Sequence, residues 1–177
     1  MGTYRRSTWS LAVFLVVGTP LPGQAQEQTP LKMVYAVWKS PGAAANIMSQ
    51  MSKKTYDKVE AYAVIVKNSS GKVELKQRHN KAGGSHQAMQ AAEVLDTAVA
   101  RLGALPPNAA DSAVGYAPGG PASRLSEKDF KKVVRMLDPG ESAVLLISPE
   151  PEVSEVERVL GMGSQGAPEF VEVDLND

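Results

Sequence analysis

The sequence predicts an α/β domain of the α+β kind, with a ferredoxin-like order: a βαββ unit, a variable helical insert and an αβαβ unit. Three observations predict it: strand-length apolar runs at 32–38, 59–67 and 142–148, helical apolar stripes between them, and a pair of strands joined by a turn cluster. Strands interleaved with helices favour a mixed sheet, and we expect its helices to lie mainly on one face.

The first strand and helix are predicted from the segment that follows residue 31. Residues 32–38 (KMVYAVW) are almost all apolar, which is typical of a buried strand. Ser40 and Pro41 then favour a helix start, with serine as the N-cap and proline at the first helical position. The apolar face of this helix consists of Ala44, Ile47, Met48 and Met51.

A β-hairpin is predicted next. The centre of the 59–67 strand is apolar at every position, which indicates burial on both faces. The 72–78 segment alternates apolar and polar residues and is therefore a half-exposed strand. Between them, 68–71 (NSSG) has the composition of a turn.

The middle of the chain is predicted to contain one helix and one irregular segment. Residues 87–102 are alanine-rich, and their larger apolar side chains recur at helical spacing. Residues 103–124 are rich in glycine and proline, and a loop of that length is uncommon in a compact domain unless it has a function or is disordered.

Regular structure is predicted again from Ser126. Ser126 and Asp129 have the spacing of a capping box, which begins an amphipathic helix. A buried strand at 142–148, a short acidic helix at 149–160 and an edge strand at 170–175 complete the αβαβ unit.

Residues 1–25 are predicted to be a secretory signal peptide. Arg5 and Arg6 form a positive region ahead of the apolar stretch 9–17, and small residues precede a cleavage site after Ala25. The apolar stretch is too short to span a bilayer, since a spanning helix needs about 20 apolar residues. We therefore expect export to the periplasm or the extracellular space, the alternative being an uncleaved N-terminal anchor.

The exported part is predicted to be a short flexible leader, 26–31, followed by a single domain, 32–177. The full chain has 19 basic and 19 acidic residues, and loss of Arg5 and Arg6 leaves a small acidic excess. Bulk charge thus gives no attraction to nucleic acid. Cysteine is absent, which excludes disulfides and thiolate metal sites. No transmembrane helix is expected in the mature chain.

These patterns resemble a bacterial family of uncharacterised domains that is usually labelled a predicted membrane protein or a domain of unknown function. The carrying segments are MVYAVW with AANIMSQM, VEAYAVIVKNSSGKVELKQ, and SEKDFKKVVRMLDPGESAVLLI, which together cover roughly 32–80 and 125–175. The resemblance implies a fold and no activity. The family's apolar Gly/Ala-rich central segment is missing, because 81–124 contains charged residues throughout.

Two groups of side chains are candidate binding sites. Lys72, Lys76 and Arg78 are expected to share one strand face, where they would attract an anion or an acidic partner. The alternative is a solvated face whose charges protect a sheet edge from aggregation. His79 and His86 are a weak candidate metal site, and the alternative is a pair of exposed loop histidines.

No arrangement of residues predicts catalysis. The sequence has no G-x-S-x-G motif and no complete phosphate loop, and its acidic C-terminal segment lacks the ligand spacing of a calcium loop. We expect no cofactor and a non-enzymatic, exported domain that associates with itself or with another envelope protein. The alternative is a small-ligand or metal-binding domain that uses 79–124 as a lid.

Overall fold

A computed structural model describes residues 29–105, 125–163 and 165–175. The predicted signal peptide lies outside the described residues, as does 106–124, most of the predicted variable segment. The division of the chain into signal, leader and domain therefore stays a prediction.

The described chain is a mixed α+β fold with a five-stranded sheet. Its strands are β1 (Leu31–Trp38), β2 (Ala61–Lys67), β3 (Val73–Asn80), β4 (Ser142–Pro149) and β5 (Glu169–Asp174). Its helices are α1 (Ala43–Gln50), α2 (Lys53–Tyr56), α3 (His86–Gly103), α4 (Glu127–Met136) and α5 (Val153–Gly161), and a 3-10 turn, η2 (Glu150–Glu152), precedes α5. The strands and longer helices lie within a few residues of their predicted positions, whereas α2 was not predicted.

The sheet is antiparallel throughout, so the prediction of a mixed sheet was wrong. The strand order is β3-β2-β4-β1-β5, and each neighbouring pair is antiparallel. The ferredoxin-like topology is not confirmed. The strand that separates β1 from β2 is β4, while β3 lies at an edge. Composition explains this arrangement, because β4 is apolar at almost every position and is buried, whereas the alternating, charged β3 is mostly exposed.

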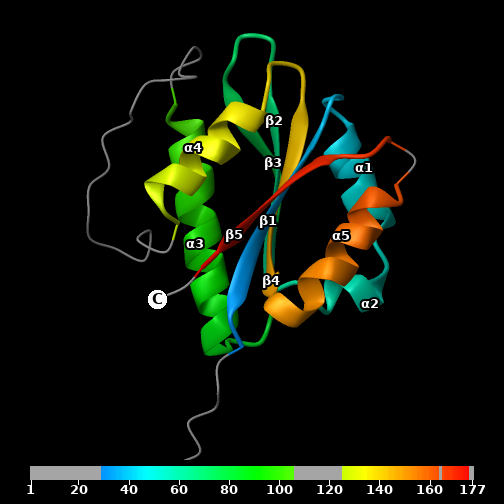
Figure 1. Ribbon diagram of the computed structural model, residues 1–177, viewed down its shortest axis with the longest axis vertical. Helices are drawn as coiled ribbons and strands as arrows, with labels where there is room; N and C mark the ends of the chain where they lie inside the picture. Colours follow the sequence, from blue (N-terminus) through cyan, green and yellow to red (C-terminus); the bar gives the residue numbers. More distant parts are fainter. Residues whose placement is uncertain (1–28, 106–124, 164, 176–177) are drawn as a thin grey trace, which may run out of the picture.

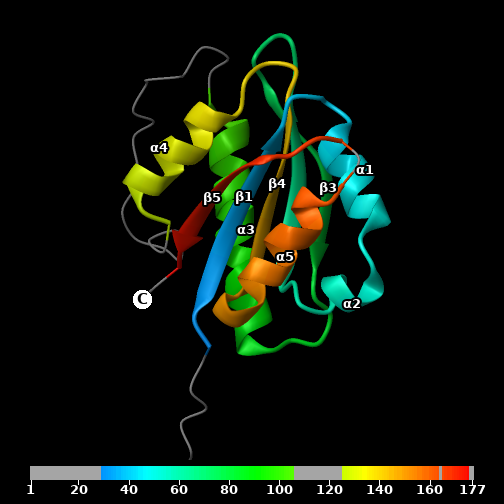
Figure 2. The same cartoon turned by 45° about the vertical axis from the view of Figure 1, so that its right-hand side comes forward.

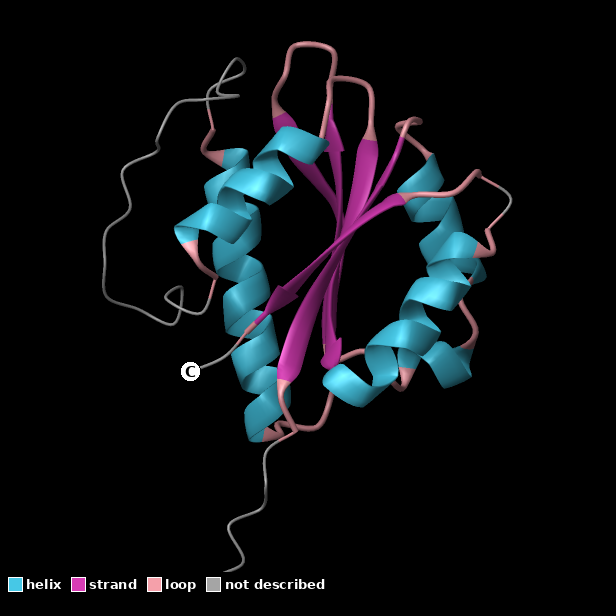
Figure 3. Cartoon of the chain, in the orientation of Figure 1, coloured by secondary structure: helices cyan, strands magenta, loops and turns pink. Residues whose placement is uncertain are grey.

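Helices cover both faces of the sheet, so the prediction that they lie mainly on one face was also wrong (Figures 1 and 3). The helices α3 and α4 cover one face, and α1, α2 and α5 cover the other, an arrangement that Figure 2 shows from a second direction. Successive strand residues enter different cores: Tyr35 packs under α3 and α4, and Val34 packs under α1 and α5. Strands that are apolar at every position need cover on both sides, which a single helical layer cannot supply.

Of two predicted helix starts, one begins a helix and the other does not. Ser126 begins α4 as predicted: its Oγ accepts a hydrogen bond from the backbone N–H of Asp129 (3.1 Å) and donates to the Asp129 carboxylate (2.6 Å). Ser40 and Pro41, by contrast, do not begin a helix. They form a turn, and α1 starts at Ala43 with Gly42 as its N-cap. Ser40 instead accepts a hydrogen bond through its carbonyl oxygen from the Ser142 hydroxyl.

Candidate ligand-binding groove

A groove of about 650 Å³ opens at one end of the sheet, where β1 and α4 end and β4 and β5 begin. This end is at the top of Figure 1, where the chain leaves β1 and where the red segment enters β5. Three segments that lie far apart in the sequence form the groove: the end of β1, the turn between α4 and β4, and the loop ahead of β5. Its size is typical of a small-molecule pocket.

Trp38, the last residue of β1, lines the groove and is almost completely buried, with 1% of its surface exposed. Its indole N–H is buried and has no hydrogen-bond partner in the described part of the chain. A buried donor without a partner costs about 1–3 kcal/mol. A ligand that accepts this hydrogen bond would recover part of that cost.

A second unpartnered group, the Tyr35 hydroxyl, lies deeper in the fold. Its oxygen is buried and, within the described residues, makes no hydrogen bond. Burial raises the pKa of Tyr35 far above its ordinary value, and the negative charge of Glu141, a groove residue, raises it further. Tyr35 is therefore a neutral phenol with an unpartnered buried hydroxyl.

The groove walls carry charges of both signs. On one side, α4 and the following turn supply Arg135, Asp138 and Glu141, and the Glu141 carboxylate accepts a hydrogen bond from the Asp138 backbone N–H (2.8 Å). Lys39 follows Trp38, and Glu169 begins β5 opposite Val37. The described chain places no hydrogen-bond or ion-pair partner on the side chain of Lys39 or of Glu169. Both side chains are exposed and available to a bound molecule.

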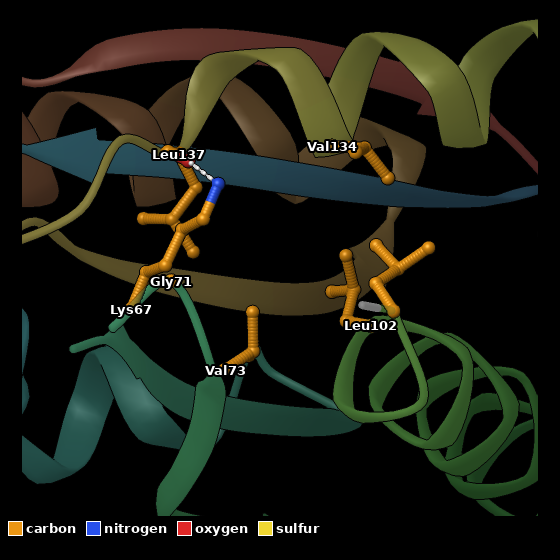
Figure 4. A pocket seen from close by; sticks show the side chains of 7 residues that line it. Lys67, Gly71, Val73, Leu102, Val134 and Leu137 are labelled. Carbon is orange, nitrogen blue, oxygen red and sulfur yellow. Dashed lines mark hydrogen bonds between the residues drawn. The ribbon is translucent and has the colours of Figure 1, made fainter. Parts of the chain in front are cut away.

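A smaller pocket lies at the end of α3 and contains about 20 Å³, enough for a single water (Figure 4). Its walls are mainly apolar, from Val73, Leu102, Val134 and Leu137 among others. Lys67 crosses it, and its ammonium donates a hydrogen bond to the carbonyl oxygen of Leu137 (2.9 Å), the C-cap of α4. We assign this pocket a structural role, because the Lys67 contact satisfies a free carbonyl at a helix end.

The predicted basic patch does not form a single face. The register of β3 shifts between its pairs with Val64 and Ile65, and Lys76 is the extra residue at this bulge. Arg78 pairs with Ala63 and forms an ion pair with Asp96 of α3 (2.7 Å). Lys76 forms an ion pair with Glu74 (2.7 Å). Glu74 pairs with Val66, and Val66 lies on the opposite face of β2 from Ala63, the partner of Arg78. The bulge breaks the alternation on which the prediction of a shared face for Lys72, Lys76 and Arg78 depended.

The two histidines lie in different environments. His79 is stacked on Tyr62 (ring centroids 5.5 Å apart) and meets Tyr56 edge-on (6.2 Å). His86 is the first residue of α3, and its Nε2 is 2.7 Å from the amide nitrogen of Gln90. Among the described residues, no group of three or more His, Asp or Glu side chains could hold a metal ion.

The acidic residues near the C-terminus are gathered around a lysine. The Lys32 ammonium lies 3.2 Å from Glu150, 3.5 Å from Glu172 and 3.5 Å from Asp174. The Lys32 ammonium thus occupies the position between these three carboxylates that a bound metal cation would need.

The groove was not predicted from the sequence. Its local signals are weak: a tryptophan and a lysine where a buried strand ends, an Asp-Pro-Gly-Glu turn, and a Gln-Gly-Ala loop. Each is an ordinary connection by itself, and only the antiparallel pairing of β1 with β4 and β5 brings the three segments together.

No known protein family, curated protein or solved structure matches this chain. Across residues 29–105, 125–163 and 165–175, none of the helices combines the length and the apolar character needed to cross a membrane.

Proposed function

We propose that this protein is an exported domain that acts by binding a small molecule in the groove at the end of the sheet. The observation that carries the proposal is Trp38, a buried groove residue whose indole N–H lacks a partner among the described residues. Export is supported by the signal-peptide pattern of 1–25.

The groove has the features of a binding site on a rigid scaffold. The end of β1, which is paired on both sides by β4 and β5, lines it, and its charged side chains come from the ends of neighbouring elements and the turns between them. A sheet with helices on both faces holds such turns in place at little conformational cost to a ligand.

The chain offers a direct optical test. It contains two tryptophans, Trp9 and Trp38, so Trp9→Phe in the full chain leaves Trp38 as the only tryptophan. We would screen metals, anions, nucleotides, sugars and amino acids for a change in Trp38 emission and for a rise in Tm. A ligand at about 100 times its Kd adds about 2.7 kcal/mol of stability.

A pair of variants locates the binding. Ala167→Phe places a ring in the groove wall and is expected to weaken binding at least tenfold, whereas Ala82→Phe, in the exposed turn before α3, leaves it unchanged. A screen without any ligand that alters both Trp38 emission and Tm would contradict the proposal, as would unchanged binding by Ala167→Phe.

Head-to-tail association of copies is a second candidate, favoured by the charges of the two sheet edges. The β3 edge carries Lys76 and Arg78 against the single carboxylate Glu74, and the β5 edge carries Glu169, Glu172 and Asp174. Most of these charges also form ion pairs within the chain, with Glu74, Asp96 or Lys32, and Glu169 is the exception among the described residues. Edges of opposite charge can pair in a continuous sheet, although the β3 bulge and its charges oppose such pairing. Light scattering at increasing concentration tests it: we expect growth of the mean mass that Val171→Pro abolishes, and a constant monomer mass contradicts it.

A further inference from the structure

We infer that the molecule bound in the groove is a small zwitterion, an α-amino acid or a short peptide with free termini. This inference rests on the proposed function, because it names the ligand class of the same groove. Its basis is the distribution of charge around Trp38.

The charges in the groove are of both signs and are dispersed. Three carboxylates and two cationic side chains line it: Asp138, Glu141, Glu169, Lys39 and Arg135. The three carboxylates do not form a group that could hold a metal ion within the described chain. Dispersed charges of both signs match an organic molecule that carries an ammonium and a carboxylate at separate positions.

Lys39 and Glu169 are the side chains best placed to recognise the two ends of such a ligand. Glu169 lies opposite Val37 in the β1–β5 pair, and Lys39 is two residues beyond Val37 along the chain. Neither side chain has an ion-pair or hydrogen-bond partner within the described residues. An ammonium would bind the Glu169 carboxylate and a carboxylate would bind the Lys39 ammonium, through charge-assisted hydrogen bonds.

The rest of the groove suits the body of the ligand. Val37, Met136 and Ala167 supply apolar surface, and the buried Trp38 lies beside them. About 650 Å³ leaves room for a peptide of a few residues as well as for a single amino acid.

The test uses the full chain with Trp9→Phe and three related probes: the dipeptide Leu-Leu, its N-acetyl derivative and its C-terminal amide. We expect saturable quenching or enhancement of Trp38 emission by Leu-Leu. The acetyl and amide derivatives, each of which lacks one charge, are expected to bind at least tenfold more weakly.

Two variants assign the two ends. Glu169→Gln is expected to abolish the preference for the free ammonium, and Lys39→Gln the preference for the free carboxylate. Both residues are exposed, so the fold should survive either change. Glu93→Gln on α3 and Lys54→Gln on α2 are matched controls at exposed positions outside the groove, and they should retain both preferences.

The outcomes separate this inference from the proposed function. Equal binding of all three probes, or preferences that both groove variants retain, would overturn the zwitterion. If Trp38 responds to a sugar or a nucleotide but not to Leu-Leu, the ligand class is wrong and the binding function stands. If no probe of any class alters Trp38 emission or Tm, the binding function is wrong as well.

Discussion

Lys81 donates a hydrogen bond to the nearly buried carboxylate of Glu60, with 2.8 Å between Nζ and Oε1. Only 6% of the Glu60 side chain is exposed, against 41% for Lys81. The backbone N–H of Lys81 also donates to the Glu60 carbonyl oxygen (2.8 Å). The pair therefore joins the residue before β2 to the residue after β3 and closes the open end of the hairpin.

Lys81→Met should destabilise the domain through this pair. The variant leaves the Glu60 carboxylate buried without its cation, and we expect the free energy of unfolding to fall by about 1–2 kcal/mol. This is less than the loss expected for a fully buried ion pair, because Lys81 is partly solvated. Urea denaturation followed by circular dichroism measures the loss. Adding Glu60→Gln should restore part of it, and a Lys81→Met midpoint equal to that of the native chain would contradict the role of the pair.

Two glycines near the end of α5 should respond to alanine in opposite ways. A Cβ at Gly163 would lie 1.7 Å from the Cδ1 atom of Ile47, a buried residue of α1. A Cβ at Gly161 would have no neighbour within 4 Å. We expect Gly163→Ala to cost about 1–3 kcal/mol by overpacking, and Gly161→Ala to add about 0.4–1 kcal/mol by restricting the unfolded chain. Thermal denaturation measures the change in Tm for each variant. Equal changes in Tm would contradict the prediction, because they would show that the Ile47 side chain moves aside without destabilising the fold.

Most element types could be predicted from the sequence because they depend on local patterns. The run at 142–148 became β4, and the Ser126 cap begins α4 where expected. The strand order could not be read in the same way. A strand that is apolar at almost every position, such as β4, does not specify which neighbours it pairs with, because only the side-chain period is set locally.

The geometry of the candidate sites depends on long-range structure in the same way. Alternation predicts a shared face for Lys76 and Arg78 only while the register is regular, and one bulge residue ends that regularity. The groove depends on three turns whose residues, among them Trp38, Glu141 and Glu169, meet only after β1 has paired with β4 and β5. Long-range pairing of this kind leaves no local signal.

Cleavage of the signal peptide is expected between Ala25 and Gln26. The small residues Gly23 and Ala25 are at the positions that signal peptidase requires, and the first strand, β1, begins at Leu31. N-terminal sequencing of the protein exported by a bacterial host should therefore yield Gln-Glu-Gln. An intact Met1 on the exported protein would instead indicate a retained anchor.

Glu157 and Glu155, on the same helix, should affect stability in opposite directions at neutral pH. Burial raises the pKa of Glu157 above its ordinary value, and the nearby Glu172 carboxylate raises it further, opposed by Lys32. The folded chain therefore binds the Glu157 proton more tightly than the unfolded chain does. The contribution of Glu157 to stability accordingly falls as the pH rises through 4.5, the ordinary pKa of the carboxyl. For Glu155 the sign is reversed. The Arg158 hydrogen bond lowers its pKa, and its contribution is present above the ordinary value and lost as the pH falls.

Thermal unfolding of Glu157→Gln and Glu155→Gln between pH 3 and pH 7 tests this pair. At pH 7 we expect Glu157→Gln to raise the Tm and Glu155→Gln to lower it, because glutamine removes an unfavourable charge in the first case and a favourable one in the second. Near pH 3, where the Glu157 carboxyl is protonated in both states, the Glu157→Gln gain should vanish. Each variant is the other's control for the loss of a carboxylate on α5. Tm shifts of the same sign at pH 7 would contradict the charge environment that Lys32, Glu172 and Arg158 create around this helix.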